Sequence, residues 1–182
     1  MRPLLARAPL DVSLKRGRQS VRYALIALSL MAAGYALLYF PYPPTSFPVR
    51  ALTFYLHVVA SASALGSRVL DRTVAVSGDL VYGRFSLRIV LDCAALDAHV
   101  LYAAAVAAFP VVWSRRVLGI LVGSTLIAAT NIARIVALYA AGLYWPGAFH
   151  VLHEEVFQFG IVLVALLTFL GWLGWARSAP AS

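Results

Sequence analysis

Residues 94–145 read AALDAHVLYAAAVAAFPVVWSRRVLGILVGSTLIAATNIARIVALYAAGLYW, two apolar runs separated by Ser114-Arg115-Arg116. Each run, 94–113 and 117–145, is long enough to cross the ~30 Å hydrocarbon core of a bilayer as a helix. Arginines beside a span favour the cytoplasmic side of the membrane. The stretch therefore predicts two transmembrane helices whose short connection lies in the cytoplasm.

The rest of the chain extends this pattern. Apolar residues make up 62% of the 182 residues and charged residues only 12%, a composition that excludes an ordinary soluble domain. Two more apolar runs, 23–40 and 156–175, are long enough to span, and Arg177 closes the second one on the cytoplasmic side. We therefore expect an all-α polytopic membrane protein with about four transmembrane helices.

Charge predicts the orientation. Six of the fifteen Lys and Arg residues precede Tyr23, so residues 1–22 are expected to form a basic cytoplasmic segment beside the lipid bilayer, and residues 23–182 a single membrane-embedded domain. The net charge of +8 is thus explained by topology, and no nucleic-acid partner is predicted.

Two segments do not read as simple spans. Residues 51–70 are apolar but are interrupted by His57 and three serines, and periodicity alone leaves open whether they cross. With Arg115 and Arg116 in the cytoplasm, parity predicts that this segment lies on, or re-enters, the outer face. Residues 73–91 alternate apolar and polar side chains around Gly78-Asp79 and Gly83-Arg84, which predicts a short extracytoplasmic β-hairpin.

Three chemically capable residues fall at similar depth. At ~1.5 Å rise per residue, Cys93 lies about 33 Å from Arg115, Arg134 about 27 Å from Arg116, and His153 about 36 Å from Arg177. Each distance is close to the thickness of the hydrocarbon core. We therefore expect Cys93, Arg134 and His153 to meet near the outer boundary of the membrane.

An arginine within the apolar run 128–136 is costly unless it faces protein or water. Asn131, three residues before Arg134, shares its helical face and is expected to orient the guanidinium. The alternative is an arginine that extends to the outer headgroups.

His150 and His153 are also three residues apart, with Glu154 adjoining. Two histidines without a third ligand are a weak signal for zinc, so neither a metal nor another cofactor is predicted. Asp97, four residues after Cys93, is expected near the face of the cysteine. A lone cysteine is by default a buried apolar residue, and it becomes a candidate nucleophile only beside a base or a cation.

The order Cys93, Asn131-x-x-Arg134 and His153-Glu154 resembles the exosortase/archaeosortase family over residues 73–175. Members carry a Cys at the head of one span, Asn-x-x-Arg late in the next, and a His or Arg at the head of the following one. The Cys of the family is usually followed by Ser-Gly, where this chain has Ala94-Ala95.

The resemblance implies a cysteine transpeptidase in the cell (inner) membrane, with its active site on the extracytoplasmic face. It implies substrates that are exported proteins ending in a recognition motif, a transmembrane helix and a basic cluster. Cys93 would be the nucleophile, His153 the acid or base, with His150 as the alternative, and Arg134 the oxyanion donor. A non-enzymatic assembly factor, in which Arg134 pairs with a partner helix, is the other function left open. The oligomeric state is not predicted.

Overall fold

The computed structural model describes residues 8–178. Five helices make up most of it: α1 (Ala8–Tyr39), α2 (Phe47–Ser67), α3 (Leu96–Ala108), α4 (Trp113–Tyr144) and α6 (Phe157–Ser178). Within this range, four helical segments are long and apolar enough to cross a membrane: Gly17–Tyr39, Phe47–Ser67, Trp113–Tyr144 and Pro146–Ser178. The structure therefore supports a mostly helical, multi-pass membrane protein.

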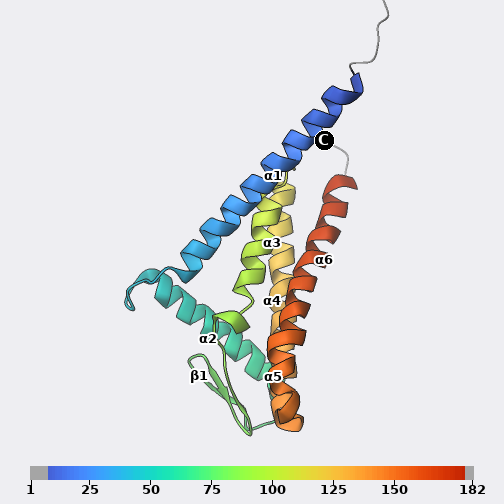
Figure 1. The fold of residues 1–182 in the computed structure, drawn as a ribbon. Helices are drawn as coiled ribbons and strands as arrows, with labels where there is room; N and C mark the ends of the chain where they lie inside the picture. Colours follow the sequence, from blue (N-terminus) through green and yellow to red (C-terminus); the bar gives the residue numbers. More distant parts are fainter. Residues whose placement is uncertain (1–7, 179–182) are drawn as a thin grey trace, which may run out of the picture.

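Helices α3, α4 and α6 run side by side, and α1 packs on α3 (Figure 1). The first described turns of α1 and the last turns of α6 lie at the same end of this bundle, where α4 begins. The opposite end carries α2 and a small sheet. Helix α1 starts at Ala8 and continues without a break through residues 22 and 23, so the described part of the basic segment is helical.

Helix α3 differs from its prediction. A span over residues 94–113 was expected, but α3 has 13 residues, about 20 Å at 1.5 Å each, and ends at Ala108. Pro110 explains the end, because the residue before a proline avoids helical backbone and Phe109 is extended. The ring of His99 reaches from α3 to the carbonyl of Ser124 on α4, 3.1 Å away.

Helix α2 crosses the end of the bundle that carries the sheet obliquely (Figure 1). The Tyr55 hydroxyl donates to the Ala94 carbonyl at 3.0 Å, level with Asn131 of α4, and Gly66 packs against Val136. Between these contacts α2 advances about 16 Å along its axis, whereas α4 advances about 8 Å. Although α2 is long enough to span, its contacts are confined to one end of α4.

The predicted hairpin is a three-stranded antiparallel sheet. Its strands are β1 (Ala75–Ser77), β2 (Leu80–Tyr82) and β3 (Ser86–Arg88), in the order β1-β2-β3. The predicted turn residues Gly78-Asp79 and Gly83-Arg84 separate the strands, so the turns were right but a strand was missed. Val81 and Leu87 point inward onto the core formed with α2 and α4, which the third strand completes.

A buried carboxylate fixes the sheet to the bundle. Asp71 follows α2 and accepts hydrogen bonds from the backbone and hydroxyl of Thr73, the backbone of Arg84 and the hydroxyl of Tyr139 on α4. Gly83 makes this approach possible, because a Cβ there would lie 2.6 Å from the Tyr139 hydroxyl. One side chain thus joins α2, the sheet and α4.

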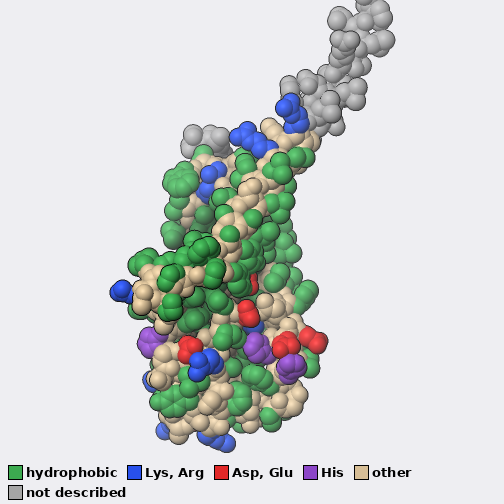
Figure 2. Space-filling model, turned by 60° about the vertical axis from the view of Figure 1, so that its left-hand side comes forward, with side chains coloured by type: hydrophobic (Ala, Val, Ile, Leu, Met, Phe, Trp, Pro, Cys, Tyr) green, Lys and Arg blue, Asp and Glu red, His purple; other side chains and the backbone are tan. Residues whose placement is uncertain are grey.

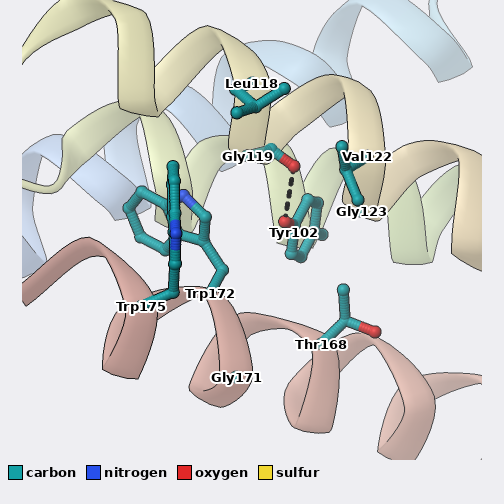
Figure 3. Close-up of a pocket in the computed structure, with 9 residues that line it drawn as sticks. All are labelled: Tyr102, Leu118, Gly119, Val122, Gly123, Thr168, Gly171, Trp172 and Trp175. Carbon is teal, nitrogen blue, oxygen red and sulfur yellow. Dashed lines mark hydrogen bonds between the residues drawn. The ribbon is translucent and has the colours of Figure 1, made fainter. Parts of the chain in front are cut away.

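At the other end, Gly119 and Gly123 of α4 make room for aromatic side chains of the same chain. A Cβ on Gly119 would overlap Trp172 of α6, and a Cβ on Gly123 would overlap Tyr102 of α3. The Tyr102 hydroxyl donates to the Gly119 carbonyl at 2.7 Å (Figure 3). The apolar pocket drawn there, about 290 Å³, lies near Arg115 and contains none of the predicted site residues.

Candidate functional site

Cys93 lies at the junction between the sheet and α3. It ends the one-turn 3-10 helix Leu91–Cys93, and its side chain is 1% exposed. Ala94 has ordinary helical backbone, but Ala95 has φ 54° and ψ 24°, the left-handed conformation that costs an L-residue about 1–2 kcal/mol. This reversal lets α3 start in a new direction directly after the sulfur.

His153 faces the sulfur from the other side of the site. Its Nε2 lies 3.4 Å from Cys93 Sγ, close enough for a proton to pass between the two atoms. His153 belongs to a π-helical turn, Leu152–Val156, that precedes α6. Its Nδ1 is buried and has no hydrogen-bond partner within residues 8–178, and Phe149 packs edge-on against the ring.

Asn131 and Arg134 complete the group from α4. The Asn131 side-chain amide donates to the Cys93 carbonyl at 2.9 Å, and an Nη of Arg134 donates to Asn131 Oδ1 at 3.4 Å. Both residues are buried, Asn131 at 2% and Arg134 at 6% exposed. The structure thus brings together the four residues Cys93, Asn131, Arg134 and His153 that sequence order and depth singled out.

The surroundings of the sulfur set its ionisation. Burial raises the pKa of the Cys93 thiol, the backbone hydrogen bond at Val90 and the positive charge of Arg134 lower it, and Asp92 raises it. The thiol is therefore protonated at rest near neutral pH, and forming the thiolate requires a base. His153 Nε2 is placed to be that base.

The remaining predicted residues lie outside this group. His150 is exposed, and its Nε2 lies 3.2 Å from a carboxylate oxygen of Glu154, so the three-residue spacing does not bring His150 and His153 to one site. Asp97 accepts hydrogen bonds from the Tyr39 hydroxyl at 3.1 and 3.2 Å. This contact links α3 to α1.

Acidic and histidine side chains gather in the lower half of the face drawn in Figure 2, whereas the charged side chains at the upper end of that face are Lys and Arg. No three His, Cys, Asp or Glu side chains within residues 8–178 are close enough together to hold a metal ion. The groups that the arrangement brings together are a thiol, an imidazole and a buried cation.

Sequence reasoning missed Gln158 on the first turn of α6. Its Oε1 accepts a hydrogen bond from an Nη of Arg134 at 3.2 Å. A single amide at the start of a long apolar run is a signal that points to the bundle interior. What the sequence could not show is that Gln158 faces the same site as His153.

A small cavity of about 50 Å³ adjoins the site between α1, α3 and α6, with Asp92, Asp97 and Gln158 among its walls. A groove of about 320 Å³ lies between α4 and α6, and Arg134 forms part of its wall. Comparison with protein-family models, with curated proteins and with solved structures finds no match to this chain.

Proposed function

We propose that this protein is an exosortase-like membrane transpeptidase that cleaves the C-terminal tails of exported proteins through a thioester on Cys93. The observation that carries the proposal is the 3.4 Å contact between Cys93 Sγ and His153 Nε2, beside an arginine that Asn131 links to the Cys93 backbone. A thiol that is merely packed in a bundle needs neither a base nor a buried cation at its side.

The proposed reaction begins when the Cys93 thiol gives its proton to His153 Nε2. The sulfur forms a bond to the scissile carbonyl carbon, and Arg134 stabilises the developing oxyanion. The C–N bond then breaks, the leaving amine takes the proton from His153, and the substrate remains as a thioester. A nucleophile on the acceptor attacks the thioester carbon and gives its proton to His153. The C–S bond then breaks, and the leaving Cys93 sulfur takes that proton back from His153.

Backbone geometry adds support at the position where the sequence departs from the family. The family usually has Ser-Gly after the cysteine, so its Gly corresponds to Ala95. Ala95 has the left-handed conformation that glycine adopts without strain. Ala95 therefore keeps the backbone that the family motif suggests, at some cost in strain.

The proposed topology places the end with Arg115, Arg116 and Arg177 in the cytoplasm together with the N-terminus. Helices α1, α4 and α6 span, and α3 spans the inner part of the membrane up to Cys93. Helix α2 and the sheet then cover the extracytoplasmic end. This arrangement puts the sulfur on the side to which exported substrates are delivered.

The test is co-expression with an exported reporter that ends in a recognition segment, an apolar helix and a basic cluster. Cys93→Ala should abolish cleavage, and Arg134→Gln should reduce it by roughly 10²–10³-fold, the usual loss for an oxyanion donor. His153→Gln should also abolish it, whereas the matched variant His150→Gln should cleave normally, because His150 is exposed and away from the sulfur. All four variants must be membrane-inserted, and full cleavage by Cys93→Ala would refute the proposal.

The near-complete burial of the sulfur favours a second candidate, a non-enzymatic assembly factor in which Cys93 is packing. Under that reading no thioester forms on Cys93, and Arg134 variants lose a partner protein instead of a reaction. Mass analysis of the co-expressed protein separates the two, since only the enzyme carries a substrate fragment on Cys93.

A further inference from the structure

The π turn at Leu152–Val156 changes which side chains of α6 reach the site. In a regular α-helix, residues five apart point about 140° away from each other. In a turn with i→i+5 hydrogen bonds, residues five apart come to one face, and such turns are frequent at functional sites. His153 and Gln158 are five apart, and they contact Cys93 and Arg134 respectively.

The partners of Arg134 are all neutral. Its two Nη atoms donate to the amide oxygens of Asn131 and Gln158, and its Nε is buried without a partner within residues 8–178. Buried arginines are usually paired with a carboxylate, which cancels their charge. Here the guanidinium keeps its full positive charge next to the sulfur.

Two carboxylates nevertheless lie close by. Asp92 and Asp97 line the small cavity to which Gln158 also contributes, so Gln158 borders both the guanidinium and the space that holds the acids. Asp97 is held by the Tyr39 hydroxyl, whereas Asp92 is exposed and accepts no hydrogen bond from the described part of the chain. A movement of Arg134 toward Asp92 would pair the two charges and remove the cation from the thiol.

We propose that Gln158 is a positioning residue, a neutral acceptor that holds the Arg134 guanidinium at the cysteine and prevents it from pairing with Asp92. The catalytic consequence rests on the proposed function, but the effect on the ionisation of Cys93 does not. The charge of Arg134 favours the thiolate and that of Asp92 opposes it, so pairing them removes the favourable term. Charged and titratable groups on the elements around the cysteine include Tyr35 and Tyr39 of α1, Tyr55 of α2, Asp97 and His99 of α3, Arg134 and Tyr139 of α4, and Asp92, His150, His153, Glu154 and Glu155.

The first test is the pH dependence of Cys93 alkylation by a small uncharged reagent in proteoliposomes. Gln158→Glu keeps the size and the acceptor but adds a carboxylate on Arg134. The midpoint of its alkylation profile should rise by about 1 pH unit or more, the usual effect of a nearby charge. Glu155→Gln, an exposed change of one charge on the same turn, is the control and should leave the midpoint within about 0.3 units.

The second test separates positioning from packing. Gln158→Met keeps the volume but loses the acceptor, so Arg134 is free to pair with Asp92 and the midpoint should rise again. Adding Asp92→Asn to Gln158→Met removes the competing carboxylate and should restore most of the wild-type midpoint. Because Asp92 itself opposes the thiolate, Asp92→Asn alone is the control, and it should lower the midpoint less than it does in Gln158→Met. A purely structural role for Gln158 predicts no shift in Gln158→Met and the same fall from Asp92→Asn in both backgrounds, and either result would overturn the proposal.

Processing of the reporter provides an independent readout. Gln158→Glu should lower kcat about tenfold or more with little change in KM, because the substrate is still bound while the oxyanion donor is neutralised. If Cys93→Ala still cleaves the reporter, the enzymatic proposal fails while the alkylation profiles still decide the role of Gln158. If Cys93→Ala is inactive and Gln158→Glu is fully active, only the role of Gln158 is refuted.

Discussion

Two buried charged residues at the same end of the bundle are treated very differently by their surroundings. Asp71, 5% exposed, accepts four hydrogen bonds of 2.7 to 3.0 Å from Thr73, Arg84 and Tyr139. Among the residues that the structure describes, Arg134, 6% exposed, has two acceptors at 3.2 and 3.4 Å and no partner for its Nε. Asp71 thus has a full set of hydrogen-bond partners within the protein, whereas Arg134 has an incomplete set.

This difference suggests that Asp71 serves the stability of the fold, whereas Arg134 serves the activity proposed for the site. A buried charge with a complete set of partners is a structural joint, because each lost partner leaves a desolvated group. A buried charge with incomplete partners costs stability, and natural proteins accept such costs mainly at functional sites. Substitution at Asp71 should therefore harm folding, and substitution at Arg134 should harm activity.

The largest expected effect on stability is that of Asp71→Asn. The new amide places a donor opposite either the Arg84 or the Thr73 backbone N–H, so one of these N–H groups loses its acceptor beside a buried side chain. The melting temperature in detergent at pH 7 should fall by about 5 °C or more. Tyr139→Phe, which removes one donor to Asp71 and no acceptor, is the control. Its melting temperature should fall less.

The same pair of proteins gives a pH test. The Thr73 hydroxyl, then the Arg84 backbone, Thr73 backbone and Tyr139 hydrogen bonds, hold the pKa of Asp71 well below its usual range, although burial opposes them. Its stabilising contribution is therefore present above the unfolded pKa of about 3.9 and is lost as pH falls below it toward the lower folded pKa. The gap in melting temperature between wild type and Asp71→Asn should narrow below about pH 4, and a constant gap would contradict the assignment.

Arg134→Met, in contrast to Asp71→Asn, should harm activity and leave stability nearly unchanged. The apolar side chain removes a buried charge, and the amide oxygens of Asn131 and Gln158 lose one donor each. These terms oppose each other, so the melting temperature should stay within about 2 °C of wild type. Cleavage of the reporter should be lost. The double variant Arg134→Met/Gln158→Met, which removes an orphaned acceptor as well, should be the more stable of the two. Unfolding of Arg134→Met as early as that of Asp71→Asn would erase the distinction between the two charges.

The sequence predicts the group around Arg134 but gives no sign of the one around Asp71. Cys93, Arg134 and His153 stand out because each is chemically conspicuous in an apolar setting and because helical rise converts their positions into depth. The estimate for Cys93 assumed a continuous helix, which Pro110 breaks, yet Asn131 on the unbroken α4 shows the cysteine at a similar level. Long, strongly periodic segments are likewise predictable from the sequence.

Asp71 and Gln158 escaped notice for physical reasons. The partners of Asp71 lie 2, 13 and 68 residues away, so its role depends on tertiary contacts that no local pattern encodes. The π turn brings Gln158 to the same face as His153. A regular periodicity of 3.6 residues would place the two side chains on different faces of the helix. The third strand was missed because three-residue strands are too short for alternation to register.

The smallest expected effect sharpens the contrast at the backbone beside the sulfur. Ala95→Gly relieves the strain of the left-handed backbone, which is worth about 1–2 kcal/mol. It also loses a buried methyl group and increases the entropy of the unfolded chain, and these two costs together are of similar size. Its stability should stay within about 0.5 kcal/mol of wild type, and reporter cleavage should persist.

Ala94→Gly is the matched control. Ala94 is equally buried but has φ −86°, where glycine brings no relief, so the same two losses should cost about 1.5 kcal/mol. The difference between the two variants in denaturant or thermal unfolding measures the strain stored at Ala95. Equal losses of stability in the two variants would mean that the backbone at Ala95 is unstrained. The region around Cys93 would then not differ from that around Asp71 in backbone strain.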